Sequence, residues 1–245
     1  MKKLRFNKET GEKGFTLFEI IIALAISMVV MAAIYASVNM AQKSSSSVTK
    51  KVITQQDARA ILDIMAMEIR MASFNPNPPA STSTWDTIPT HTTNANCPDL
   101  VQPCPGQTSP PSCKTYKGIQ VAGPNQIHIS MDLDGSGVIG NAPNEHILYT
   151  YSSINNAIYR NVSCGGNQPI LGGKDDSETK VINDESTPLF QYFDRDGNST
   201  TSIPDIRRIR ITIIAQTKSA DMLSGRMRVI PYTTDILVKN HVLSP

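Results

Sequence analysis

An apolar run from residue 15 to residue 42 constrains this chain more than any other feature. It contains one charged residue, Glu19, and neither proline nor glycine interrupts it. As an α-helix it is about 40 Å long, enough to cross a bilayer. The residues before it carry five basic and two acidic side chains, a net charge of +3. This asymmetry predicts a single-pass membrane protein with a cytoplasmic N-terminus and a translocated C-terminal part.

Two ordinary explanations compete for this segment. A secretory signal peptide would be cut after its apolar stretch, and residues 32–36 (Ala-Ala-Ile-Tyr-Ala) match such a site loosely. A plain transmembrane anchor is the other. Neither explains Glu19, because an ionised carboxylate inside an apolar helix is costly unless it is paired. Glu19 is therefore a candidate functional residue.

The residues around Glu19 resemble a known signal. The stretch Lys13-Gly14-Phe15-Thr16-Leu17-Phe18-Glu19 is similar to the class III signal of type IV pilins and type II secretion pseudopilins, although Val or Ile is commoner than Phe18 at its position. The resemblance implies that prepilin peptidase cuts after Gly14 and N-methylates Phe15. It also implies that Glu19 pairs with the Phe15 amine of a neighbouring subunit and so docks it into a filament.

This resemblance sets the expected location and partners. The protein is expected in the bacterial inner membrane with a periplasmic head, and then in a pilus at the cell surface. The implied partners are prepilin peptidase, other major and minor pilins and the inner-membrane assembly platform.

The pattern after the apolar run predicts that the helix continues to about Phe74. One apolar stripe recurs at three- and four-residue spacing: Ala58, Ile61, Leu62, Met65, Ile69 and Ala72. The helix is expected to stop at Asn75-Pro76. Its second half should pack on a sheet, since clean heptads for a coiled coil are missing.

Alternating residues predict an antiparallel sheet in the C-terminal half. Ile127, Ile129 and Met131 share one face, and Ile147, Tyr149 and Tyr151 share another, with a hairpin turn at 155–156. Residues 208–213 alternate between Arg or Thr and Ile, and a last strand is expected within 227–238. The predicted fold is α+β, a long N-terminal helix packed on an antiparallel β-sheet head, as in pilins.

The predicted organisation has five parts. They are a cleaved leader (1–14), a transmembrane and filament-core helix (15–42), an amphipathic helix (43–74), a Pro- and Cys-containing loop region (75–117) and a β-rich head (118–245).

Two looser similarities indicate a subgroup. The helical stretch 55–72, with Gln55, Asp57 and Glu68, resembles the PilW and GspJ group of minor pilins, as does the ending 233–240. The large head also favours a minor subunit. The expected function is thus a PilW-like minor pilin of a type IV pilus. The alternatives are a GspJ-like minor pseudopilin of type II secretion and a competence pilin with a DNA-binding head.

The four cysteines are expected to form disulfides in an oxidising periplasm: Cys97, Cys104, Cys113 and Cys164. If two bonds form within the chain, Cys164 must pair with one of the other three, and spacing does not say which. Zinc is the alternative, but no C-x-x-C occurs.

Two acidic turns invite a calcium interpretation. Asp132, Asp134 and Ser136 resemble the start of an EF-hand loop, but Pro143 occupies the position that needs a glutamate. The second set, the better candidate of the two, is Asp194, Asp196, Asn198 and Asp205. We expect both to be glycine-containing β-turns and no cofactor to bind, calcium being the one possibility left open.

Motifs for catalysis are missing, so the chain is not expected to be an enzyme. The four histidines are scattered, without metal-type pairing, and no nucleophile elbow or phosphate-binding loop occurs. Arg207, Arg208 and Arg210 form a small basic cluster. We expect it to be a solvated or subunit-contacting face, with nucleic acid as an unlikely partner.

Overall fold

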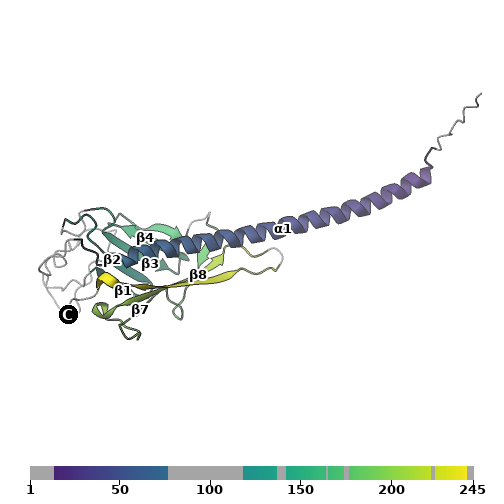
Figure 1. Cartoon of the computed structure of the whole chain (residues 1–245). Helices are drawn as coiled ribbons and strands as arrows, with labels where there is room; N and C mark the ends of the chain where they lie inside the picture. The colour runs from purple at the N-terminus through teal and green to yellow at the C-terminus, as the bar shows by residue number, and fades with distance from the viewer. Residues whose placement is uncertain are drawn as a thin grey trace, which may run out of the picture. The chain divides into compact units, whose positions relative to one another are not determined.

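A single long helix, α1 (Leu17–Arg70), opens the fold in this computed structural model. The structure describes residues 14–76, 118–136, 142–163, 165–173, 177–221 and 224–241. The chain divides into two compact units, residues 1–47 and 48–245, so α1 contributes its first part to one unit and its second part to the other. Figure 1 traces the elements in chain order.

The predicted apolar stripe faces the core of the second unit. Ala58, Leu62, Met65, Ile69 and Ala72 are buried, and Ile61 packs against them. The helix ends four residues before the predicted Phe74, because the chain turns at Ser73 with a positive φ of 65°. The Ser73 N–H then donates to the Ser130 carbonyl, and the Asp132 N–H donates to the Phe74 carbonyl. The end of the helix is thus fastened to the sheet by backbone hydrogen bonds.

Gly118 shows how closely this junction is packed. Its φ is +60°, and a Cβ added there would lie 2.1 Å from the Ser73 nitrogen. Only glycine therefore fits opposite Ser73.

Two antiparallel sheets complete the second unit. The first has five strands in the order β1-β2-β3-β4-β5: β1 Ile119–Gly123, β2 Gln126–Ser130, β3 His146–Ser152, β4 Ala157–Val162 and β5 Gln168–Leu171. The β3–β4 connection is the predicted hairpin, and Asn156 takes a positive φ in its turn.

The second sheet is built around β8 (Arg208–Thr217). β6 (Thr179–Val181) and β7 (Phe190–Phe193) pair with opposite ends of β8 along one edge, and β9 (Val229–Leu237) pairs along its whole length on the other. Short 3-10 turns lie at Ile203–Asp205 (η2) and Lys239–His241 (η3).

One hydrophobic core joins the helix to both sheets. The alternating residues predicted to face inward are buried there: Ile127, Ile129, Met131, Ile147, Tyr149, Tyr151, Ile209, Ile211 and Ile213. Removal of these side chains from water is the main favourable term for folding the unit. The predicted α+β architecture of a pilin is confirmed.

Candidate functional site

The junction between Gly14 and Phe15 is exposed, and nothing in the described chain requires a glycine there. A Cβ added to Gly14 would meet no atom within 4 Å, and the φ of this residue lies outside the left-handed region. Phe15 is 85% exposed. Because neither backbone strain nor packing explains Gly14, its identity fits recognition by an external enzyme better than a need of the fold.

The start of α1 is a capping box between Thr16 and Glu19. The Glu19 carboxylate accepts hydrogen bonds from the Thr16 backbone N–H (2.9 Å) and the Thr16 hydroxyl (3.0 Å). The Glu19 N–H in turn donates to the Thr16 Oγ1 at 3.3 Å. Two helix-end donors are thereby satisfied reciprocally. Sequence reasoning assigned no role to Thr16, although the T-x-x-E pattern before an apolar run is the signal for this cap.

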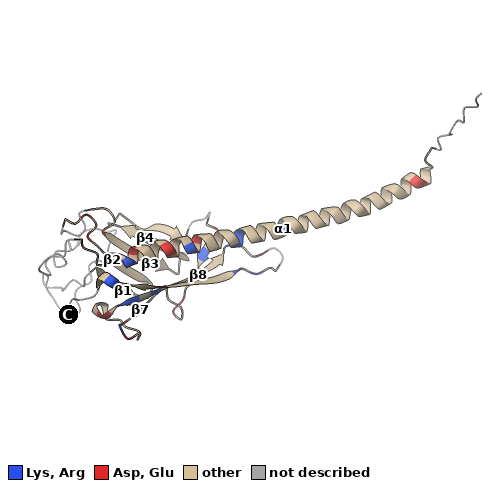
Figure 2. Cartoon of the chain, in the orientation of Figure 1, with Lys and Arg blue, Asp and Glu red and all other residues tan. Residues whose placement is uncertain are grey.

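The first part of α1 exposes its apolar side chains on every side. The described chain has one helix long and apolar enough to cross a membrane, and none of its most apolar window is buried within the chain. Residues 17–42 of α1 contain no basic residue, and Figure 2 shows an acidic residue near the start of the helix, where the sequence has Glu19. Such a surface has to be covered by lipid or by other helices.

The comparison with protein families decides between the explanations of this segment. Residues 10–35 match the family model described as the prokaryotic N-terminal methylation motif. The chain carries a prepilin-type N-terminus. This supports a type IV pilin or a pseudopilin in general, processed by prepilin peptidase and assembled with other pilins. No curated protein and no solved structure matches the chain.

Gly14, Phe15 and Glu19 all lie within the residues that match the methylation motif. The three lie within six residues, at the exposed start of an apolar helix that could cross a membrane. Their roles in cleavage, methylation and assembly stay predictions.

The four cysteines predicted to form disulfides, Cys97, Cys104, Cys113 and Cys164, lie outside the described residues. The same holds for the leader before Gly14 and for most of the loop region 75–117.

The first acidic turn brings three carboxylates together. Asp132, Asp134 and Glu145 place oxygen atoms within 4.8 Å of one another, and Asp132 and Glu145 are fully buried. Glu145 accepts from the Leu133 and Ala142 N–H groups at 3.1 Å each, and Asp132 accepts from the Gly135 N–H at 2.8 Å. These bonds link described residues at the two ends of the β2–β3 connection, and the sequence did not predict a role for Glu145.

The second acidic turn behaves differently. Asp194 accepts backbone N–H bonds from Asp196 (2.9 Å) and Asn198 (2.8 Å), which makes the predicted glycine-containing turn between Phe193 and Ser199. Among the described residues, no three-carboxylate group forms around Asp194, Asp196 and Asp205. The sequence ranks this loop above the first one as a calcium candidate, and that ranking stays a prediction. In an EF-hand loop the residue at position twelve folds back to the first acidic residues. Asp205 holds that position in the sequence, but it lies in η2 and forms no carboxylate group with Asp194 and Asp196.

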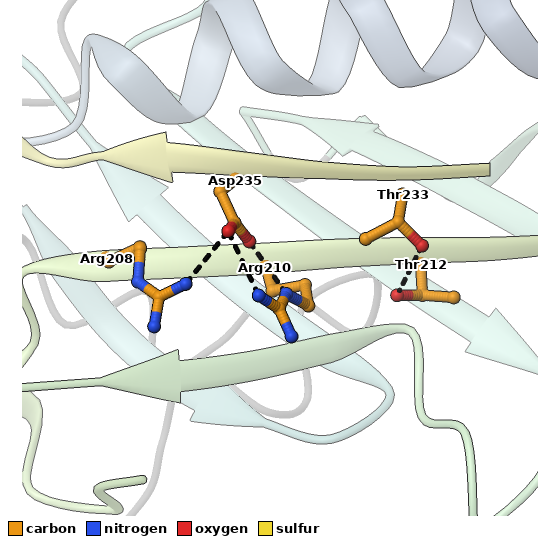
Figure 3. Close-up of polar contacts among 5 residues, drawn as sticks. All are labelled: Arg208, Arg210, Thr212, Thr233 and Asp235. Atoms are coloured by element: carbon orange, nitrogen blue, oxygen red, sulfur yellow. Dashed lines mark hydrogen bonds and ion pairs between the residues drawn. The ribbon is translucent and has the colours of Figure 1, made fainter. Parts of the chain in front are cut away.

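The basic cluster is held by an acid on the neighbouring strand (Figure 3). Arg208 donates to Asp235 at 2.8 Å, and Arg210 donates twice, at 2.8 and 3.0 Å. Both guanidinium groups also lie over the Phe193 ring, at 4.0 and 5.2 Å from its centroid. Hydrogen bonding from Arg210, and then from Arg208, lowers the pKa of Asp235. Half of the positive charge at this pair is thus neutralised within the chain.

Arg207 takes no part in this group, because its guanidinium donates to the carbonyls of Pro204 and Ile206. The three arginines that stand together in the sequence therefore do not form one free basic patch.

Two histidines that look scattered in the sequence stack in the structure. The rings of His128 and His146 lie 5.5 Å apart, and His146 Nδ1 is 3.0 Å from the Ser130 hydroxyl. Both residues are buried, at 1% and 2% exposure, so neither offers a surface for a substrate. The motif family matched by this chain is structural rather than catalytic.

Proposed function

We propose that this protein is a PilW-like minor pilin that primes the assembly of a type IV pilus or is incorporated into it. The observation that carries the proposal is the placement of Glu19. It is the one charged residue between 15 and 42, and it caps the start of an apolar helix directly after the cleavage junction. Cleavage after Gly14 would leave an α-amino group four residues from this carboxylate.

The capping box suggests how the carboxylate is used. In a single subunit, Thr16 supplies two hydrogen bonds to Glu19, which offset part of the cost of placing a charge in the membrane. In a filament, the Phe15 amine of a neighbouring subunit offers a full positive charge. Because attraction between opposite charges is strong in a low-dielectric bundle, the carboxylate fixes the axial position of each new subunit.

The assignment to a minor subunit rests on the second unit. It contains two packed sheets joined to the helix by one core, a larger head than a single sheet would make. The stretch 55–72, which resembles the PilW and GspJ group, comprises the end of α1 and the two residues after it, and its buried side chains belong to this core. The second similar stretch, 233–240, lies in β9 and η3. A minor pilin would act with prepilin peptidase, other pilins and the assembly platform, at the inner membrane and then in the pilus.

A clean deletion tests the proposal. Surface pili are counted by electron microscopy, and secreted enzymes are measured in the same cultures. We expect loss of pili with normal secretion, restored by the wild-type gene and not by Glu19→Ala. The matched control is Ser27→Ala in the same helix, because the Ser27 hydroxyl bonds only to the Ala23 carbonyl of its own helix. This variant should restore pili.

Other outcomes assign the protein elsewhere. Normal pili with enzymes retained in the periplasm would make it a GspJ-like pseudopilin of type II secretion. Normal pili and normal secretion with loss of DNA uptake would favour a competence pilin. Restoration of pili by Glu19→Ala would contradict the docking role of the carboxylate.

A further inference from the structure

The connection that joins β8 to β9 is tied to α1 at Lys50, within the second unit. The Lys50 ammonium group donates to the Ser219 hydroxyl at 2.7 Å, across 169 residues of sequence. The base of the loop is closed by hydrogen bonds from Thr217 Oγ1 to the Ser219 carbonyl and from the Arg228 N–H to Thr217 Oγ1. The described base of this connection therefore lies beside Lys50.

The described residues of this hairpin end are predominantly basic. They include five basic side chains: Lys50, Lys51, Lys218, Arg226 and Arg228. The acidic side chains beside them are Asp221, which pairs with Arg228 at 3.1 Å, and Glu178, whose carbonyl accepts from the Lys218 N–H. The net charge of this group is +3. A cationic surface of this kind attracts an anionic partner.

Exposed apolar side chains lie among these charges. Met227 stands between Arg226 and Arg228 and is 45% exposed, and Val229 is 49% exposed. Arg226 and Arg228 are themselves exposed. Apolar side chains between long basic ones are typical of surfaces that rest in the interface of a membrane, because the basic stems reach to the headgroups while the apolar groups enter the acyl boundary.

The chain length places this end close to the end of the apolar segment. Lys50 follows Gln42, the last residue of the apolar run, by eight residues of the same helix. Eight helical residues rise about 12 Å. So short a stretch of chain lets Lys50 reach the level of the headgroups, within about one to two Debye lengths of an anionic bilayer.

We propose that Lys218, Arg226, Met227 and Arg228, all described residues of the β8–β9 connection, form with Lys50 and Lys51 a docking surface for anionic lipid headgroups of the leaflet from which α1 emerges. The proposal rests on the proposed function in one respect, the insertion of the apolar helix into a membrane. It adds that the head is held against the bilayer before the subunit enters a filament. A lipid surface fits better than nucleic acid, because it supplies both the negative charge and an apolar layer for Met227.

Fluorescence quenching by brominated lipids tests this contact in the full-length chain. The sole natural tryptophan is first replaced (Trp85→Phe), and the reporter is Met227→Trp. The matched reporter is Thr201→Trp, an exposed position near the opposite end of the ten-residue strand β8. At about 3.3 Å per residue, β8 separates the two reporters by roughly 30 Å. Each variant is reconstituted in bilayers that contain the same fraction of brominated lipid, either with zwitterionic headgroups alone or with added anionic lipid.

The proposal makes three expectations for quenching. Met227→Trp is quenched more strongly than Thr201→Trp in anionic bilayers, the excess falls in zwitterionic bilayers, and added salt lowers it. The double substitution Lys51→Glu/Arg226→Glu abolishes the excess, since each basic residue near an anionic surface is worth roughly fivefold in affinity. The same change of charge at distant exposed positions, Arg70→Glu/Arg195→Glu, leaves it intact.

The failure of this inference is distinguishable from the failure of the proposed function. Flotation of the protein with vesicles reports insertion of the apolar helix independently of the loop. Flotation with equal quenching of the two reporters overturns the docking surface while the proposed function stands. If the fluorescence of Met227→Trp is unaffected by brominated lipid but changes when other pilins are added, the surface contacts a protein partner. That outcome would also overturn the proposal.

Discussion

The guanidinium group of Arg160 on β4 binds the carboxylate of Glu68 on α1 through two hydrogen bonds, at 2.6 and 3.1 Å. The same carboxylate accepts a hydrogen bond from the Tyr149 hydroxyl on β3. Burial, together with this bond to Glu68, raises the pKa of Tyr149. The side chains of Glu68 and Arg160 are 18% and 23% exposed. This polar group joins the helix to the first sheet at a point that the apolar core alone does not fix.

We expect Glu68→Gln to lower the free energy of unfolding by about 2 kcal/mol. The substitution keeps the shape of the side chain but removes the charge to which Arg160 and Tyr149 donate. The measurement is urea unfolding of the full chain in detergent, followed by circular dichroism. Asp63→Asn, an exposed acid on the same helix, is the control and should change the unfolding midpoint little. Equal effects of the two substitutions would show that the group adds no stability.

The capping box predicts a local effect of Thr16→Ala. Loss of the N-cap costs about 1 kcal/mol, which corresponds to roughly fivefold faster opening of the first helical turn. Amide hydrogen exchange of residues 17–20 in detergent measures this directly. Thr16→Ser keeps the hydroxyl and should retain the protection of the wild type. If Thr16→Ala exchanges no faster than Thr16→Ser, the hydroxyl does not cap the helix.

The open surroundings of Gly14 predict that Gly14→Val leaves the fold unchanged but blocks processing. Within the described residues nothing lies close enough to obstruct the new side chain. We expect unchanged helix content by circular dichroism, and a protein that keeps its leader by mass spectrometry after expression with prepilin peptidase. Lys13→Gln is a control on the leader side of the junction. Cleavage of Gly14→Val at the wild-type rate would contradict the requirement for glycine.

The Asp235 carboxylate predicts a contribution to stability that depends on pH. Its pKa is lowered in the folded protein below its ordinary value of 3.8, mainly by hydrogen bonding from Arg210. The stabilisation is therefore complete above the unfolded-state pKa and is lost as the pH falls through the folded-state pKa. As the pH falls below about 4, Asp235→Asn should lose less stability than the wild type.

Thermal unfolding of both proteins across this range measures the effect. Asp196→Asn, in the exposed turn after β7, should follow the wild-type curve more closely. If the stability of the wild type and of Asp235→Asn falls equally with pH, the bonds from Arg208 and Arg210 do not lower the pKa of Asp235.

Local patterns predicted the elements of the fold well, because period and alternation report which side of a helix or strand is buried. The stripe from Ala58 to Ala72 and the alternating isoleucines of β8 reached the core as expected. The prepilin-type signal was equally clear, because Gly14, Phe15 and Glu19 lie within six residues of one another and residues 10–35 match the methylation motif. The sequence also contained the T-x-x-E cap, which was overlooked.

Only the tertiary structure decided the contacts between distant residues. Glu68 meets Arg160 across 92 residues, and Lys50 meets Ser219 across 169. Glu145 joins Asp132 and Asp134, whereas Asp205 does not join Asp194. Local sequence determined the apolar helix, its processing signal and the inward face of each strand, because these follow from neighbours a few residues apart. The pairing of charges between elements depends on how helix and sheets pack around the shared core, and spacing along the chain does not encode it.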